Sequence, residues 1–199
     1  MFGDPQNVIN SATNIVSDVA DVHVGLVIKP SRFYAPDNIG VPAFRSLNVG
    51  SMEVLNTDWV YFTQRGMMEN QKTVTHTGDV LIVRSGNPGT SCVVTPEFDG
   101  YNVIDLIIAH PNTDKMLPEF LCAYTNYPHG KIQIENLQHG VAQKHFNVSL
   151  YKSMKIIVPS LQKQNKFVMI LKEADKSKYR GEESRHFLGI CYKMVMNMI

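Results

Sequence analysis

Cysteine is scarce in this 199-residue chain, and long apolar runs are missing. The three cysteines, Cys92, Cys122 and Cys191, are far apart and form no CxxC pair, which argues against a disulfide framework and favours a reducing compartment. No apolar run approaches the roughly 18–20 residues that a membrane span requires. The first residues, Met1 to Pro5, lack the basic and apolar segments of a signal peptide. We therefore expect a cytoplasmic protein with inert, buried thiols and no membrane partner.

The signatures of common enzymes are also absent. The chain contains no phosphate-binding GxxxxGK(S/T), no GxGxxG after a strand, no HExxH and no GxSxG. The segment Asn87-Pro88-Gly89 lacks the second proline and the aromatic residue of the aminomethyltransferase motif, and it indicates a turn instead. We therefore expect no catalytic residue and no cofactor.

The histidines do not form a metal-binding pattern in the sequence. They are scattered along the chain, at His23, His76, His110, His129, His139, His145 and His186. The closest pair, His139 and His145, has no Cys, Asp or Glu nearby at the spacing that metal ligands show. We therefore expect no metal site, and a small enzyme only if distant histidines and carboxylates converge in the fold.

Charge is distributed unevenly between the two parts of the chain. The net charge is +1. Residues 159–199 hold eight lysines and arginines against four acidic residues, which is +4, so the remainder carries −3. A protein that coats phosphates without sequence preference should be strongly basic. Composition therefore argues against that class but permits a DNA reader whose few cations lie on one face.

The sequence pattern of residues 1–158 indicates an irregular, β-rich α+β domain with a few helices. Short β-branched and aromatic runs alternate with turn residues at Asn87–Gly89, Asp99-Gly100 and Pro128–Gly130. The expected strands are His23–Lys29, Trp59–Phe62, Val80–Arg84, Cys92–Thr95, Val103–Ala109 and Lys155–Val158. The expected helices are Asn7–Val19 and Pro118–Tyr127, the latter with a proline at its first position.

Residues 159–199 indicate one long helix. Ser160 is a good N-cap, and no further proline follows. The helix would be about 60 Å long if straight. One face of this helix follows positions at alternating steps of three and four residues. The residues on it that we expect to contact a partner helix are Phe167, Leu171, Ala174, Leu188, Tyr192 and Val195. Two interpretations remain open: a spacer that pairs in a coiled-coil-like manner, or an amphipathic helix folded back on the core and broken near Gly181. Gly181 and Gly189 each cost about 1 kcal/mol relative to alanine, so the spacer needs a partner.

Several segments together resemble the target-recognition domain of type I restriction–modification specificity subunits. They are Asp21–Gly25, Lys29–Tyr34, Val41–Val49, Gly78–Gly89 (similar to the family's GDxLxxRxGxxG), Pro118–Leu121, Gly140–Asn147 and Ile157–Gln164. Each motif is weak alone, but their order and spacing are specific. Met1–Pro5 resembles the end of such a subunit's central helix, which suggests a C-terminal half or a half-sized subunit. The sequence departs from the family at Arg180-Gly181-Glu182 and in its Met-rich end.

Three groups of residues are candidates for DNA contacts. They are Lys29, Ser31, Arg32 and Tyr34; Arg84 and Asn87; and Gln143, Lys144 and His145. Arginine can contact guanine or phosphate, and the polar run at 143–145 can donate to phosphates and base edges. Each group also has a structural interpretation: Arg84 can form an internal ion pair with Asp79, Gly86 and Gly89 can belong to a hairpin, and residues 143–145 can form a solvated turn.

The resemblance implies a non-catalytic protein that reads one half of a bipartite double-stranded DNA site. Its long helix would pair with a second recognition half, or with a second copy of the chain, and set the distance between half-sites. Methyltransferase subunits and a restriction subunit would join it and supply the chemistry. The alternative functions are a protein–protein adaptor that does not read DNA and, less favoured, a small enzyme.

Overall fold

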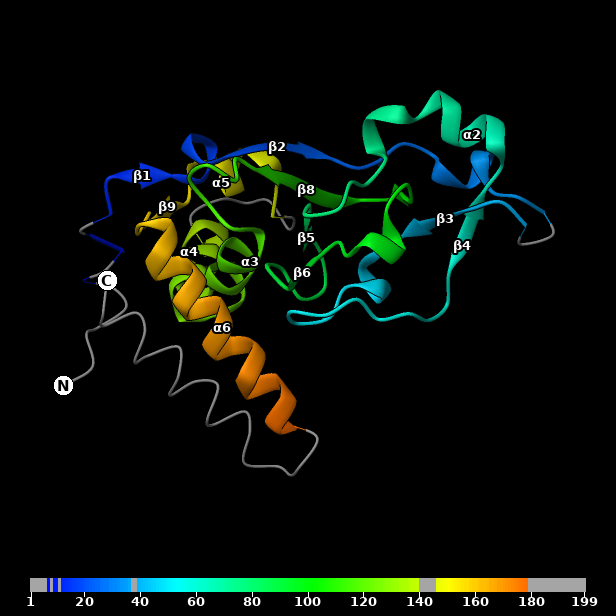
Figure 1. Ribbon diagram of the computed structural model, residues 1–199. Coiled ribbons are helices and arrows are strands. Elements are labelled where there is room, and N and C mark those ends of the chain that lie inside the picture. The colour runs from blue at the N-terminus through cyan, green and yellow to red at the C-terminus, as the bar shows by residue number, and fades with distance from the viewer. Residues whose placement is uncertain (1–6, 8, 11, 37–38, 140–145, 179–199) are drawn as a thin grey trace.

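The computed structural model describes residues 7, 9–10, 12–36, 39–139 and 146–178. At its centre lies a four-stranded antiparallel sheet with the order β2 (Ala20–Val24), β8 (Leu106–Pro111), β5 (Val80–Val83), β6 (Ser91–Val93). Helices lie to one side of this sheet and a smaller sheet to the other, so the molecule is elongated (Figure 1).

The central strands are apolar on both faces because both faces are covered. All four residues of β5 are buried, and alternate residues of a strand point to opposite faces. Val80 and Ile82 belong to the hydrophobic cluster shared with the helices, whereas Leu81 and Val83 belong to a second cluster on the other face. The unbroken apolar run Val80–Val83 is thus explained by two cores that share one sheet.

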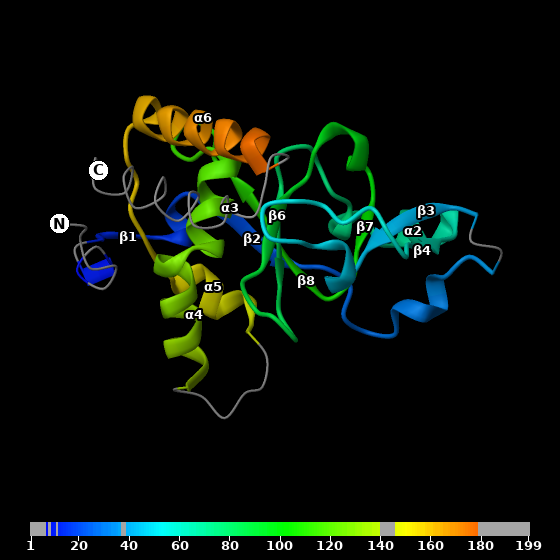
Figure 2. The same ribbon diagram turned by 90° about the horizontal axis from the view of Figure 1, so that it is seen from below.

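The first core is built by helices that cover one face of the central sheet. α3 (Pro118–Asn126) packs against β5 and β6 and contacts α4 (Pro128–His139) and α6 (Leu161–Lys178). α5 (Val148–Ser153) lies beside β2, and the short strands β1 (Asn14–Ile15) and β9 (Lys155–Ile156) pair at the edge of this region. Figure 2 shows α6 lying across α3.

A three-stranded sheet forms the other end of the molecule. Its order is β4 (Val60–Phe62), β3 (Val41–Phe44), β7 (Asn102–Val103), with β3 and β7 parallel. The helix α2 (Gln64–Glu69) follows β4, and five 3₁₀ turns interrupt the described chain: η1 (Val16–Asp18), η2 (Pro30–Phe33), η3 (Ser46–Asn48), η4 (Gln71–Thr73) and η5 (Pro96–Phe98). Aromatic rings of Phe44, Trp59, Phe98 and Tyr101 pack against one another where this end meets the central sheet.

The α+β class with a few helices is confirmed, and several predicted elements recur with shifted bounds. The strand expected at His23–Lys29 ends at Val24. The strand expected at Val103–Ala109 is two strands, β7 and β8, because Asp105 has a φ of 51° and interrupts the extended backbone between them. The helix at Pro118 is confirmed with Pro118 in the first turn.

Two local predictions are wrong. The helix expected at Asn7–Val19 is too long: residues 7, 9 and 10 are helical, but β1 and η1 follow from Asn14, because Asn14 and Ile15 pair with β9 and Val16 enters the core. Pro128–Gly130 begins α4 instead of forming an isolated turn. Gly130 permits this, since a Cβ there would lie 2.5 Å or less from the carbonyl oxygens of Tyr124 and Thr125.

The described part of the C-terminal helix folds back on the core. Ser160 Oγ accepts a hydrogen bond from the Lys163 N–H (3.4 Å), which confirms the predicted cap. Phe167 and Leu171, expected to contact a partner helix, are 1% and 6% exposed, and Phe167 packs edge-on against Phe120 of α3 at 5.2 Å. This corrects their assignment, because the core of the same chain already covers both side chains. Leu188, Tyr192 and Val195 lie outside the described residues, as does the side chain of Ala174.

Two of the three cysteines lie in the described core. Cys92 and Cys122 are free and fully buried, as expected, and burial raises the pKa of both thiols, that of Cys122 to about 12. Cys191 lies outside the described residues. Among the helices that the structure describes, none is long and apolar enough to span a bilayer.

Candidate nucleic-acid interface

The first candidate cluster lies on η2, at the end of the molecule that carries β3 and β4 (Figure 1). Lys29 has a left-handed backbone (φ 47°) that turns the chain into Pro30, whose fixed φ suits the first position of the turn. Lys29, Ser31 and Arg32 are exposed. The Arg32 guanidinium lies 4.5 Å from the centre of the Phe33 ring, which supports the cation without neutralising its charge.

Tyr34 has a different role from its three neighbours. It is half-buried, bridges to Phe62 of β4 and packs its ring against that of Phe62 at 6.0 Å. Phe33 is buried against the same phenylalanine, with ring centres 5.8 Å apart. These two rings therefore anchor η2 to the small sheet and hold Lys29 to Arg32 at the surface.

α2 adds a cation to this surface that the sequence did not indicate. Thr63 caps the helix by accepting from the Gly66 N–H (3.0 Å), and the helix contacts η2. Gly66 allows that contact, because a Cβ there would lie 2.9 Å from the Cβ of Phe33. Arg65, next to Gly66, is 89% exposed and pairs laterally with Glu69. No sequence signal distinguished Arg65, because nothing local showed that α2 packs beside η2.

Arg84, from the second candidate cluster, is engaged within the protein. Its guanidinium pairs with Asp105, and its Nε donates to the Phe146 carbonyl at 3.3 Å. Its own carbonyl accepts from the Phe146 N–H at 3.2 Å. The side chain is 15% exposed. The internal ion pair considered from the sequence therefore exists, but with Asp105 and not with Asp79; contact with DNA stays a prediction.

The loop that carries Asn87 is a tight connection packed against α4. Gly86 and Gly89 both have positive φ (83° and 82°), as a hairpin after β5 requires. A Cβ on Gly89 would lie 2.2 Å from Ile134 Cδ1 of α4, and Lys131 Nζ donates to the Pro88 carbonyl at 3.1 Å. Asn87 itself is exposed at the tip of this loop. The hairpin interpretation is confirmed, and DNA contact by Asn87 stays a prediction.

The third candidate cluster lies outside the described residues. Gln143, Lys144 and His145 directly precede Phe146, which is buried against Tyr151 and bonded to Arg84. The chain thus returns to the β5–β6 region immediately after residue 145.

The structure also brings together three residues that the sequence did not connect, His76, Asp79 and His110. One imidazole nitrogen or carboxylate oxygen from each lies within 4.8 Å of those of the other two.

Comparison with known protein families finds one match that spans most of the chain. The family model described as "Type I restriction modification DNA specificity domain" matches residues 16–184. The chain belongs to this family. A search of curated protein sequences found no match.

Solved structures of type I restriction–modification proteins share the fold. One, from a study of complex assembly and conformational transition of the type I restriction–modification system, superposes with a TM-score of 0.64 at 17% identity, covering 92% of this chain and 43% of that one. The HsdS subunit from Thermoanaerobacter tengcongensis gives 0.60 at 17% identity, covering 92% and 44%. The S subunit from M. genitalium gives 0.53 at 15%, covering 94% and 46%. This specificity domain therefore spans less than half of the subunits that it matches.

The motifs that this specificity domain shares with its family serve mainly as scaffold. In Gly78–Gly89, three glycines occupy positive φ, the apolar residues of β5 divide between two cores, and Arg84 ties Phe146 to Asp105. In Ile157–Gln164, the fully buried Gln164 accepts from the Leu117 N–H at 2.8 Å and donates to the carbonyls of Lys115 and Pro159. The side chains named in these two segments are therefore engaged in holding the fold together.

Proposed function

We propose that this chain is the recognition half of a type I specificity subunit and reads one half of a bipartite DNA site. The observation that carries the proposal is the match to the specificity-domain family over residues 16–184. The fold shared with two S subunits supports it, and the chain aligns with 44–46% of those subunits' length, the share expected of one of two recognition halves.

The surface that we assign to DNA contact is formed by η2 and α2. Lys29, Arg32 and Arg65 carry exposed positive charge on two elements that touch each other, and Ser31 adds a hydroxyl. Next to Lys29, the side chains of Val27 and Ile28 are 48% and 73% exposed. Cations contact phosphates or guanine, while exposed aliphatic side chains fit thymine methyl groups. The surface therefore combines backbone positioning with base readout.

Packing and a backbone hydrogen bond hold this surface in place before DNA binds. η2 is held by the packing of Phe33 and Tyr34 on Phe62, and its chain is further tied by the Thr63 N–H, which donates to the Phe33 carbonyl at 2.8 Å. A preorganised surface loses less conformational entropy on binding. The described residues carry few cations here, so phosphate contacts alone would supply modest affinity.

Partner subunits complete the proposed complex. The C-terminal helix separates this half from a second recognition half or a second copy of the chain, and the exposed face of α6, which includes Met169 at 68%, is available for such a contact. Methyltransferase subunits would bind the S-adenosylmethionine and a restriction subunit would cleave. We propose no cofactor and no catalytic residue for this chain.

Grafting tests the proposal. Replacing one recognition domain of an active type I methyltransferase complex with this chain should change one half of the methylated sequence, as read by sequencing of methylated sites. An unchanged site would exclude DNA reading by this chain and favour the adaptor function. Turnover by the isolated chain would instead support the enzyme.

Charge variants locate the interface within the same assembly. Arg32→Gln and Lys29→Gln should weaken binding and lower the slope of log affinity against log salt by about 1 for each phosphate contact that the substitution removes. Lys155→Gln is the matched control, because Lys155 is also exposed but lies on β9 at the opposite end of the molecule. Equal effects of the control and the η2 variants would place the interface elsewhere.

A further inference from the structure

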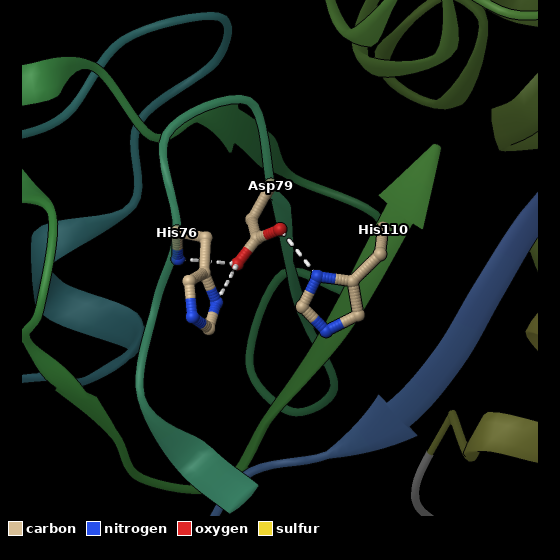
Figure 3. A group of neighbouring side chains, drawn as sticks. All are labelled: His76, Asp79 and His110. Atoms are coloured by element: carbon tan, nitrogen blue, oxygen red, sulfur yellow. Dashed lines mark hydrogen bonds and ion pairs between the residues drawn. The ribbon is translucent and has the colours of Figure 1, made fainter. Parts of the chain in front are cut away.

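A compact group of metal-ligating side chains lies where β5 and β8 meet. His76 precedes β5, Asp79 directly adjoins its first residue, and His110 lies near the end of β8 (Figure 3). One nitrogen or oxygen atom from each side chain lies within 4.8 Å of the corresponding atoms of the other two. His110 is 31 positions from Asp79 in the sequence, and the antiparallel pairing of Val80 with Ala109 brings the two together.

The backbone around this group is held firmly by hydrogen bonds. The Asp79 N–H donates to the His76 carbonyl at 2.9 Å, and the Asp79 carboxylate accepts from the His76 N–H at 2.7 Å. Between them Gly78 has a φ of 92°, which the reversal of the chain requires. Thr75, on the other side of His76, is fully buried and bonds to Phe98 and Tyr101. The positions from which the ligands project are therefore fixed before any ion binds.

The three side chains differ in exposure in a way that suits ion entry. The Asp79 side chain is 4% exposed, that of His110 31% and that of His76 69%. Asp79 pairs with His110 Nδ1, which raises the pKa of that imidazole, and its other oxygen lies 3.9 Å from His76 Nδ1. A cation arriving from the side of His76 would take the place of the proton between Asp79 and His110. The Asp79 carboxylate and the His110 ring would have to move apart to admit the ion, and His76, the most exposed of the three, would turn toward it.

We propose that His76, Asp79 and His110 form a binding site for a divalent transition-metal ion of the zinc type. Two imidazoles and one carboxylate are a ligand set that zinc accepts, at about 2.0–2.2 Å from the ion. Magnesium and calcium prefer all-oxygen sites, so the two histidines disfavour them. Three protein ligands leave a coordination position for water or another donor.

The bound ion would fasten the turn His76–Asp79 to β8. That turn leads from η4 into the central sheet, and Thr77 in it bonds to Asp99 through both its N–H and its hydroxyl. The turn connects the end of the molecule that carries the small sheet with the central sheet, and the ion would fix this turn to β8. Its role would therefore be structural. The proposal is independent of DNA recognition.

Calorimetric titration with Zn²⁺ tests the site on the full chain, purified without a histidine tag and stripped with a chelator. One ion per chain should bind, and Co²⁺ should give the visible absorption of a bound, nitrogen-ligated ion. His76→Gln should weaken Zn²⁺ binding by at least about tenfold, whereas His76→Cys should restore it because a thiolate is also a zinc ligand.

The choice of variants separates the removal of a ligand from misfolding. Asp79 is buried, so Asp79→Asn can lower metal binding simply by destabilising the fold. His76 is exposed, and its replacement leaves the backbone hydrogen bonds of the turn in place. Glu97→Gln is the control, since it alters an exposed carboxylate on η5 that belongs neither to the ligand set nor to the His76–Asp79 turn, and it should leave the affinity nearly unchanged. Absence of stoichiometric Zn²⁺ binding, or unchanged affinity in His76→Gln, would overturn the proposal and leave the three residues as a hydrogen-bonded network.

Discussion

Two side-chain amides in this protein form hydrogen bonds with strand backbone groups that would otherwise pair with a neighbouring strand. Asn126 of α3 accepts from the Ser91 N–H at 3.1 Å and donates to the Ser91 carbonyl at 2.8 Å, so it satisfies both backbone groups at the edge of β6. Gln133 of α4 does the same for Lys155 of β9, at 2.7 and 2.9 Å. Because unpaired buried backbone groups are costly, each amide ends a short sheet without leaving them unsatisfied.

His129, beside these amides, makes stability depend on pH. The residue is 4% exposed, and burial lowers the pKa of its imidazole from 6.5 to about 4. Between these two values the unfolded chain binds a proton that the folded chain does not, so the free energy of unfolding should fall as the pH drops from 6.5 toward 4. Above pH 6.5 the imidazole is neutral in both states, so the loss of stability caused by its protonation in the unfolded chain is absent.

Comparison of the wild-type chain with His129→Gln measures this effect. The difference in unfolding free energy between them should change by up to about 3 kcal/mol between about pH 7 and about pH 4, because one pKa unit corresponds to about 1.4 kcal/mol. Urea unfolding at several pH values provides the measurement. Parallel pH profiles for the two proteins would show that His129 titrates normally.

At the scale of elements, one glutamine joins two helices. Gln164 of α6 is fully buried, accepts from the N–H of Leu117 at the start of α3 and donates to the carbonyls of Lys115 and Pro159 at 2.7 and 2.8 Å. A single side chain therefore joins the residue before α3 to the first turn of α6. This contact gives Gln164, the last residue of the segment Ile157–Gln164, a structural role in the fold.

Gln164→Ala should destabilise the protein by about 2–4 kcal/mol, because it leaves buried backbone groups without partners. Gln162→Ala on the exposed side of the same helix is the matched control and should change the unfolding free energy by less than about 0.5 kcal/mol. Denaturant titration of both variants gives the comparison. Similar small effects would mean that α6 is not held by this contact.

At the scale of the whole molecule, the recognition fold extends into the C-terminal helix. The sequence suggested a boundary at residue 158, where the texture changes. Phe167, Val168 and Leu171 nevertheless belong to the same hydrophobic core as the central sheet and α3. The first part of α6 is therefore a structural component of the recognition domain, and only its exposed face and the chain beyond Leu171 are left for the proposed contact with a partner helix.

Truncation should reveal this boundary. A chain of residues 1–178 is expected to unfold cooperatively, with stability close to that of the full chain. A chain of residues 1–158 should lose cooperative unfolding, since each buried apolar side chain removed contributes about 1.5–3 kcal/mol and Gln164 is removed as well. Thermal unfolding by circular dichroism distinguishes the two. A stable 1–158 chain would restore the boundary that the sequence suggested.

The sequence by itself determined the fold class, the positions of β5 and α3, the cap at Ser160 and the family, because these depend on local patterns: an apolar run, a proline in the first helical turn, a serine before a helix and an ordered series of motifs. It could not determine which side chains meet. Arg84 pairs with Asp105, Arg65 joins η2, and His76 and Asp79 meet His110 only through packing and strand register. Periodicity is a property of neighbours along the chain, whereas a site is made by residues that the tertiary structure brings together.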